Sequence, residues 1–283
     1  MAQPVPRDLG WRLAPAWSRP ARFWMGWPDF RDDQMAREDC LGLAELLADY
    51  APVSLICSSR DAAGLALRTS SNVAALASSH GGWLMRAEAP LWLVDGDGRL
   101  VAGVAFSAVG RELVERAGVP VLEPPVGLPP GIEGDGEGTV LASVPPERRT
   151  LAETVLRDWL GVERVLWLEG GDAAGSTRFL APALVLLPPH PDLHRLLEAA
   201  RDARGRRLQL VEMPASKREG RCYADCLVAG DTVVVPDYED GRCGEALARV
   251  SAATWGRRIS AFPAAWLAPA GAGLGGVVAT QPS

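Results

Sequence analysis

The sequence has very little lysine, and this shortage limits the partners that it can bind. Lys217 is the single lysine among 283 residues, and the formal net charge is −6. Because clustered Lys and Arg are needed to neutralise phosphates, this balance argues against a nucleic-acid partner. The same balance favours cationic ligands only weakly, since an acidic surface is also an ordinary way for a protein to stay soluble.

Long apolar runs are missing as well. No stretch of about 18 apolar residues occurs, and residues 1–10 lack the apolar centre of a secretion signal. We therefore predict a cytoplasmic protein without a membrane partner.

Histidine is scarce, and cysteine forms an odd, scattered set of five that suits reduced thiols in a chain of this length. Cys222 and Cys226 stand four residues apart, but no second Cys or His pair follows at zinc-finger spacing. His80 lies in a predicted loop and is the histidine that we consider for a functional role. The sequence predicts neither a metal site nor a cofactor.

The composition predicts one globular domain over residues 1–283. Hydrophobic residues make up 48% of the chain, which allows a large buried core, and no Ser/Gly-rich linker divides it. Short apolar segments bounded by Gly, Pro or Asp predict buried strands. They cover residues 23–27, 53–57, 91–94, 100–106, 140–143, 164–168, 179–187, 208–213, 226–236, 259–263 and 277–280.

Segments with helical periodicity lie between these strands. They cover residues 33–50, 109–117, 150–160, 191–204 and 241–251. Thr150 and Glu153 have the spacing of a capping box. Turns are predicted at 95–98 and, within a hairpin, at 229–231. The result is about five blocks of strands plus a helix, each of about 50 residues, a period typical of repeat or propeller-like α/β architectures.

Six motifs in order resemble those of agmatine deiminases and bacterial-type peptidylarginine deiminases. The first is Trp17 followed seven residues later by Trp-Met-Gly-Trp-Pro, where the family has Trp-Met-x-Trp-Pro. The others are Met85-Arg86 with Pro90, Asp135-Gly-Glu-Gly-Thr139, Arg178-Phe179 with Pro182, Val233-Val-Val-Pro-Asp-Tyr238 and the glycine-rich segment 271–282. The resemblance implies the pentein fold, a five-bladed propeller of ββαβ units with pseudo-fivefold symmetry.

The resemblance also implies a chemistry. In the family, a Cys thiolate attacks a guanidinium carbon, a His acts as general acid and base, carboxylates hold the cationic nitrogens, and water releases a ureido product. No cofactor takes part.

The residues that the family needs for this chemistry are replaced here. The nucleophile position falls on Gly276 and the preceding His on Gly275. The base position holds Asp172, the aspartate after Met-Arg is Ala87, and the Glu of Glu-Gly-Gly is Leu128. The sequence therefore has no family thiol, base or carboxylate at its expected place. Trp24, Asp135, Asp172 and Glu133 remain as candidate ligand-binding residues.

Two hypotheses follow. The first is a non-catalytic binding or regulatory pentein, whose partner is a small cationic guanidine or another protein. The second is an active amidine or guanidine hydrolase of the agmatine or arginine deiminase type, in putrescine metabolism, with chemistry relocated to Cys222, Cys226 and His80. An axial cleft filled by Leu128 and Trp24 would indicate a structural role, and an open cleft would indicate binding.

Overall fold

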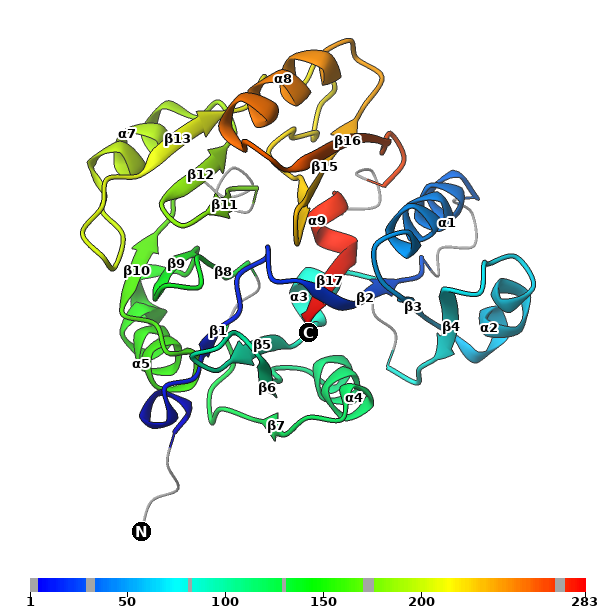
Figure 1. The fold of residues 1–283 in the computed structure, drawn as a ribbon, viewed down its shortest axis with the longest axis horizontal. Helices are drawn as coiled ribbons and strands as arrows, with labels where there is room; N and C mark the ends of the chain where they lie inside the picture. Colours follow the sequence, from blue (N-terminus) through cyan, green and yellow to red (C-terminus); the bar gives the residue numbers. More distant parts are fainter. Residues whose placement is uncertain (1–4, 29–33, 81–82, 129–130, 170–175, 268–272) are drawn as a thin grey trace.

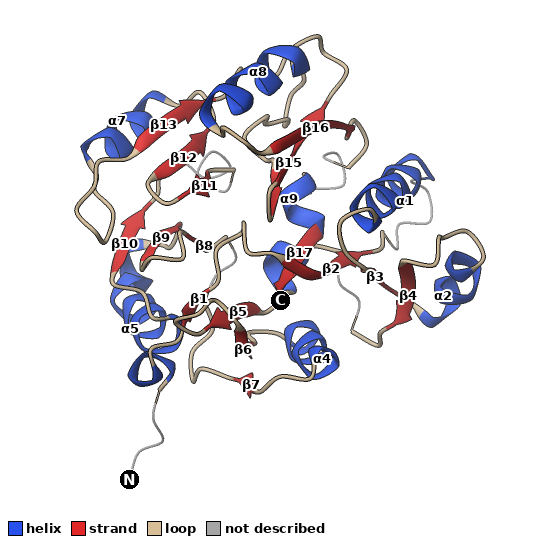
Figure 2. Cartoon of the chain, in the orientation of Figure 1, coloured by secondary structure: helices blue, strands red, loops and turns tan. Residues whose placement is uncertain are grey.

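The structure is a computed structural model that describes residues 5–28, 34–80, 83–128, 131–169, 176–267 and 273–283. These residues form a mixed α/β fold. Its sheets are arranged in a ring, and most of the helices lie on the outside of the ring (Figures 1 and 2). Two short helices, α3 (Met85–Glu88) and α9 (Leu274–Val277), lie at the centre.

The described strands form five sheets. In one sheet the order is β17 (Val278–Pro282), β2 (Pro20–Gly26), β3 (Val53–Cys57) and β4 (Val73–Ala77). The next contains β1 (Arg12–Leu13), β5 (Leu91–Val94), β6 (Leu100–Val104) and β7 (Val121–Leu122). The remaining sheets are β10 (Arg164–Trp167) with β9 (Thr139–Ala142) and β8 (Glu133–Gly134), β11 (Arg178–Ala181) with β12 (Leu184–Leu187) and β13 (Gln209–Glu212), and β14 (Leu227–Ala229) with β15 (Thr232–Asp237) and β16 (Arg258–Pro263).

Every sheet combines an antiparallel pair with a parallel pair. A helix connects the two parallel strands, as a parallel crossover requires. These helices are α1 (Gln34–Ala48), α4 (Ala108–Ala117), α5 (Arg149–Leu160), α7 (Pro191–Ala199) and α8 (Cys243–Ala253). The pairing of the C-terminal β17 with the N-terminal β2 closes the ring.

The pattern of buried residues shows which faces of the strands and helices are covered by neighbouring elements. All five positions of β3, Val-Ser-Leu-Ile-Cys, are buried, as expected of a parallel strand that is covered on both sides. On α1, Cys40, Leu43 and Leu47 recur at helical spacing and are buried in the largest apolar cluster. The helix α1 thus covers its sheet with one apolar stripe.

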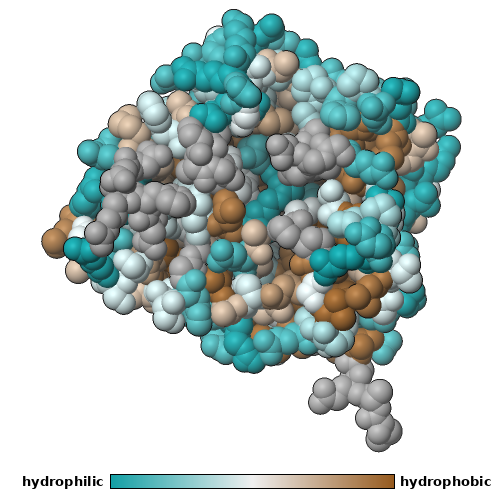
Figure 3. Space-filling model, turned by 180° about the vertical axis from the view of Figure 1, so that it is seen from behind, coloured by the Kyte–Doolittle hydropathy of each residue, from teal (hydrophilic) through white to brown (hydrophobic). Residues whose placement is uncertain are grey.

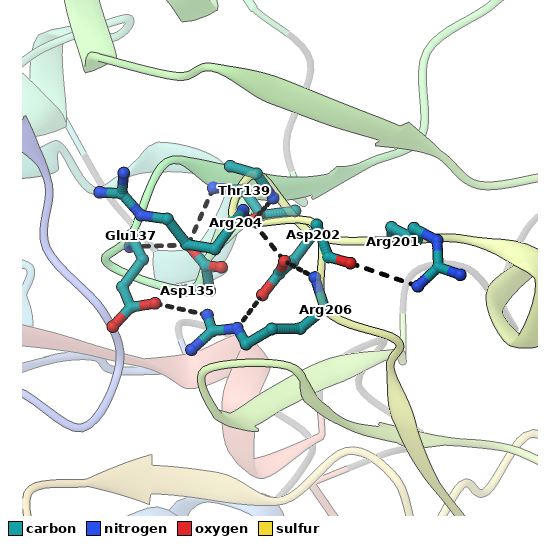
Figure 4. Close-up of polar contacts among 9 residues, drawn as sticks. Asp135, Glu137, Thr139, Arg201, Asp202, Arg204 and Arg206 are labelled. Atoms are coloured by element: carbon teal, nitrogen blue, oxygen red, sulfur yellow. Dashed lines mark hydrogen bonds and ion pairs between the residues drawn. The ribbon is translucent and has the colours of Figure 1, made fainter.

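The Asp135-Gly-Glu-Gly-Thr139 motif locks two neighbouring sheets together (Figure 4). Asp135 Oδ1 accepts hydrogen bonds from the backbone N–H groups of Glu137 and Thr139, at 2.7 and 2.8 Å. Thr139 Oγ1 accepts one from the N–H of Ala203 at 2.9 Å. Arg206 joins Glu137 to the fully buried carboxylate of Asp202, with Nε donating to Asp202 Oδ2 at 2.5 Å. The motif is therefore a clamp between β8–β9 and the turn before β13.

The structure confirms several predicted elements and corrects others. The turn at 95–98 and the hairpin at 229–231 are confirmed. The predicted strand 179–187 is two strands, because Ala183 takes a positive φ of 59° and reverses the chain. The predicted helix 191–204 ends at Ala199, since Asp202 caps a turn instead.

The capping box predicted at Thr150 and Glu153 is wrong. The helix already includes Arg149, its N-terminal cap is Arg148, and neither Thr150 nor Glu153 caps it. Sequence reasoning also missed β4, β7, β8 and the helix α2 (Ser59–Ala66). Within the described ranges, no helix is long and apolar enough to cross a membrane.

Two helix-ending glycines provide a matched test of the packing at the N-terminal segment. Gly161 after α5 and Gly118 after α4 both adopt left-handed backbone, with φ of 63° and 73°. A Cβ at Gly161 would overlap the Trp11 carbonyl oxygen and lie 3.1 Å from Arg12 Cα, whereas nothing lies within 4 Å of a Cβ at Gly118.

We expect Gly118→Ala to lower the free energy of unfolding by about 1 kcal/mol, the cost of left-handed backbone alone. Gly161→Ala should lower it by at least about 3 kcal/mol, because the chain that carries β1 must also move. Urea denaturation of both variants measures the difference. Equal losses would show that the N-terminal segment does not pack tightly on α5.

Candidate functional site

A cavity of about 170 Å³ lies at the centre of the ring. It is lined by residues of α3 and α9 and of strands from all five sheets, together with the loop before β2. Figure 3, which shows the molecule from behind, has a hollow near the middle in which hydrophilic residues are visible. Leu128 and Trp24, the side chains that could have filled an axial cleft, are not among the described residues that line this cavity.

Four charged side chains gather at this cavity. Arg86 on α3 and Glu133 on β8 face each other, with 4.0 Å between Arg86 Nη2 and Glu133 Oε2. Arg178, the first residue of β11, forms a closer ion pair with Asp225, in the loop before β14. The side chains of Arg178 and Asp225 are only 5% and 13% exposed. The chain thus supplies two guanidinium groups and two carboxylates to its own centre.

The glycines before β17 make room for the Arg178–Asp225 pair. A Cβ at Gly273 would overlap the Asp225 carboxylate. A Cβ at Gly275 would lie 2.9 Å from both Arg178 Nη2 and Asp225 Oδ1. Because real Cβ atoms essentially never come this close to other atoms, the pair requires glycine at both positions.

Burial has the largest effect on the pKa of Arg86. Its desolvation, together with the neighbouring positive charge of Arg178, lowers the pKa of Arg86 to about 10, and Glu133 and Asp225 oppose this shift. Arg86 remains protonated at neutral pH. No described residue makes a hydrogen bond to its guanidinium, so its donors face the cavity and the more distant Glu133.

Cys226 lines the cavity, but its thiol is not activated. Its Sγ donates a hydrogen bond to the Tyr223 carbonyl oxygen at 3.1 Å. Burial and the Asp225 carboxylate raise the pKa of Cys226 well above its usual value, and burial also raises the pKa of Cys222. A nucleophilic thiol requires a lowered pKa, so neither cysteine has the environment of one.

The remaining predicted site residues lie elsewhere. His80 is exposed and hydrogen-bonds through its backbone to Ser78, away from the cavity lining. Ala87 is exposed on α3, and Leu128 packs against the apolar cluster around Leu13. Gly276 lies in α9 without lining the cavity. Asp172 lies outside the described residues.

Trp24 and Asp135 were predicted to contact a ligand. Their side chains instead make hydrogen bonds within the protein. The Trp24 indole is 2% exposed and donates to Gln281 Oε1 at 3.0 Å, which fastens β2 to β17. Asp135 belongs to the clamp described above. Of the predicted ligand-binding residues in the described ranges, the structure brings Glu133 alone to the cavity.

Sequence reasoning missed the roles of Arg86, Arg178 and Asp225. The two arginines were noted as parts of motifs, and Asp225 stands between Cys222 and Cys226, where only the thiols were considered. The available signal was the apolar neighbours of the two arginines, since Arg86 follows Met85 and Arg178 precedes Phe179. In the part of the chain that the structure describes, no group of three His, Cys, Asp or Glu side chains could hold a metal ion.

Asp240 anchors the segment that carries Asp225 and Cys226. Its Oδ1 accepts hydrogen bonds from Tyr223 Oη at 2.5 Å and from the Arg242 N–H at 2.9 Å. Its Oδ2 accepts from the Lys217 N–H and from Ser216 Oγ, both at 2.8 Å. Burial on its own raises the pKa of Asp240, but the hydrogen bond from Tyr223 and the backbone donors outweigh it and lower the pKa to about 2.

Comparison with known proteins gives a consistent result. The profile of the Porphyromonas-type peptidyl-arginine deiminase family matches residues 12–282. A Streptomyces coelicolor relative is 28% identical over 262 residues, which covers 73% of this chain and 77% of that protein. The agmatine deiminase of Ectopseudomonas mendocina is 24% identical over 325 residues, covering 86% of this chain and 88% of its own.

The solved structure of the Enterococcus faecalis agmatine deiminase superposes with a TM-score of 0.88. The match covers 100% of this chain and 99% of that one, at 18% sequence identity. At this level of identity the match shows a shared fold.

We predict that the two partners of the central ion pair contribute to stability in a coupled way, so that the effects of removing them are not additive. Asp225→Asn leaves the Arg178 guanidinium buried without its carboxylate and should lower the free energy of unfolding by about 3 kcal/mol. The double variant Arg178→Met/Asp225→Asn should lose at least about 1 kcal/mol less than the sum of the single variants.

The exposed pair Arg99 and Asp97, which are 77% and 74% exposed, serves as a control for this cycle. Arg99→Met and Asp97→Asn should couple by less than about 0.5 kcal/mol. If the losses in the free energy of unfolding of the Arg178→Met and Asp225→Asn variants simply added up in the double variant, the two residues would not be energetically paired.

We also predict an acid-sensitive contribution from Asp240. Its folded pKa of about 2 lies below its usual value of 3.8, so the ionised form stabilises the fold. This stability is complete above about pH 4 and is lost as the pH falls toward 2. Urea denaturation between pH 2 and 6 should show a shallower acid loss for Asp240→Asn than for the parent chain, and parallel curves would refute the prediction.

Proposed function

The chain belongs to the Porphyromonas-type peptidyl-arginine deiminase family and is related to agmatine deiminases, and we propose that it is a non-catalytic member that binds a ligand without converting it. Its five sheets, each an antiparallel pair followed by a helix and a parallel strand, support assignment to the five-bladed pentein propeller. Its axial cavity is then the counterpart of the family's active site.

One observation carries this proposal: the carboxylates at the cavity are paired with the chain's own guanidinium groups. Asp225 binds Arg178, and Glu133 faces Arg86. A deiminase of this family needs carboxylates to hold the cationic nitrogens of its substrate. Here both carboxylates lie beside the chain's own guanidinium groups, so neither is free to hold an incoming guanidinium, which would also be repelled by Arg86 and Arg178. We therefore do not propose a cationic guanidine as the ligand.

The replaced catalytic positions support the same conclusion. Gly276 and Gly275 stand where the family has its nucleophile and the preceding His, and Ala87 and Leu128 stand where it has carboxylates. Loss of a covalent nucleophile alone typically reduces turnover by about 10⁶-fold, and the members of a catalytic unit do not replace one another. The replacement of all of them leaves no route to deimination.

A second candidate function, relocated hydrolysis, has one observation in its favour, since Cys226 lines the cavity. A thiolate attack also requires a base within hydrogen-bond reach of the sulfur. Among the described residues, Cys226 Sγ is hydrogen-bonded to a backbone oxygen, and His80 is not part of the cavity lining. We therefore retain this function as the outcome that would overturn our proposal.

A ureido-product assay tests the proposal directly. We expect no citrulline-type or carbamoylputrescine-type product from agmatine, free arginine or an arginyl peptide, because no activated thiol faces the cavity. The measurement compares the purified protein with a blank and with an active agmatine deiminase as positive control.

The variant Cys222→Ala/Cys226→Ala separates the two candidate functions. Product formed by the parent chain and lost in this variant would establish relocated catalysis and refute the proposal. Absence of product from both proteins supports a non-catalytic role.

A further inference from the structure

We propose that the axial cavity binds a small organic carboxylate, whose anionic end pairs with Arg86 and whose apolar body fills the rest of the cavity. This inference rests on the proposed function, because it assigns a ligand to the same site. It also reverses the charge of the ligand that the sequence favoured. Three features of the cavity carry it: the free donors of Arg86, the apolar wall and the distribution of the four charges.

Arg86 is a buried cation whose donors lack partners of normal geometry. A guanidinium carries five N–H donors in a planar fork that matches a carboxylate. The nearest carboxylate oxygen, on Glu133, is 4.0 Å from Nη2, which is beyond hydrogen-bond distance. The Arg86 side chain is 20% exposed, and this exposed part belongs to the cavity lining. An anion that enters the cavity can therefore form the two parallel hydrogen bonds that Glu133 does not form.

The Arg178 guanidinium is not available to bind an anion, because it already binds groups of the protein. Its Nη2 binds Asp225 and its Nη1 donates to the Thr177 carbonyl oxygen at 3.2 Å. The pair is 5% and 13% exposed and sits beneath Gly275. The anion-binding role thus falls to Arg86.

The rest of the cavity is apolar and of suitable size. The apolar residues that line it include Leu13, Trp92, Ile132, Leu227 and Val278, which come from three of the five sheets and from the loop before β8. An engineered apolar cavity of about 150 Å³ holds benzene. The space of about 170 Å³ here can accept a ligand of similar size, with its carboxylate toward Arg86.

The four charges give the proposal an internal test. Arg86 and Arg178 contribute two positive charges, and Glu133 and Asp225 contribute two negative charges. A carboxylate bound to Arg86 would add one more negative charge, close to Glu133. Removing the charge of Glu133 should tighten carboxylate binding, and removing that of Arg86 should weaken it. A merely structural role for either residue would not produce opposite changes in affinity.

Isothermal titration calorimetry on the full chain measures the binding. The probes are isovalerate and benzoate, with isovaleramide and benzamide as uncharged controls of the same shape, leucine as a zwitterion and agmatine as a cation. We expect the carboxylates to bind at least tenfold more tightly than their amides, and agmatine not to bind. Comparison of leucine with isovalerate shows whether an added ammonium group, near Glu133, strengthens the binding.

Variants locate the site. Arg86→Met should weaken carboxylate binding by roughly tenfold or more, the loss expected for a charge-assisted hydrogen bond. Glu133→Gln should strengthen it by roughly fivefold, because a like charge close to the ligand is removed. Arg86→Lys keeps the charge and should retain part of the affinity. Arg99→Met, at an exposed arginine, is the matched control and should leave the affinity unchanged.

If Arg86→Met does not fold, the comparison of carboxylates with amides in the parent chain and the effect of Glu133→Gln still decide the question. Equal affinities for carboxylate and amide, or weaker carboxylate binding in Glu133→Gln, would overturn the inference. A failure of this kind, with no ureido product in the assay above, would leave the proposed function intact. A ureido product from agmatine would instead refute the proposed function.

Discussion

The centre of this molecule depends on the requirement that a buried guanidinium group must have a carboxylate partner. Arg178 is almost fully buried at the start of β11, and a charge in that position is strongly destabilising unless it is paired. Asp225 provides the partner from the loop before β14. That loop is held in place by Asp240 through Tyr223, and by Tyr238, whose hydroxyl donates to the Cys222 carbonyl oxygen at 3.0 Å. The pair thus joins the start of β11 to the loop before β14.

The pairing also determines what the axial cavity can do. The same ring, with free carboxylates around the axis, would attract a cation, and deimination of a guanidine needs that arrangement. Here the carboxylates are held by internal arginines, and Arg86 directs its remaining donors into a space with an apolar wall. The architecture is that of the family, and both carboxylates at the centre lie beside the protein's own guanidinium groups.

The sequence predicted much of the fold, because apolar strands and amphipathic helices leave a periodic pattern. The hairpin around Gly230 and the turn at 95–98 were predictable from their turn residues. Short or partly exposed elements such as β7 and β8 leave no such pattern, and only tertiary pairing reveals them. The ion pair at the centre of the ring was less predictable. Arg178 and Asp225 stand 47 positions apart, and no local pattern in the sequence indicates that they pair.

The glycines before β17 and the Arg178–Asp225 ion pair are physically coupled. A gap-free comparison with the family places a His at Gly275 and the nucleophile at Gly276. Any side chain at Gly275 would put its Cβ 2.9 Å from Arg178 Nη2 and from Asp225 Oδ1. The family's His and the present position of the pair therefore exclude each other.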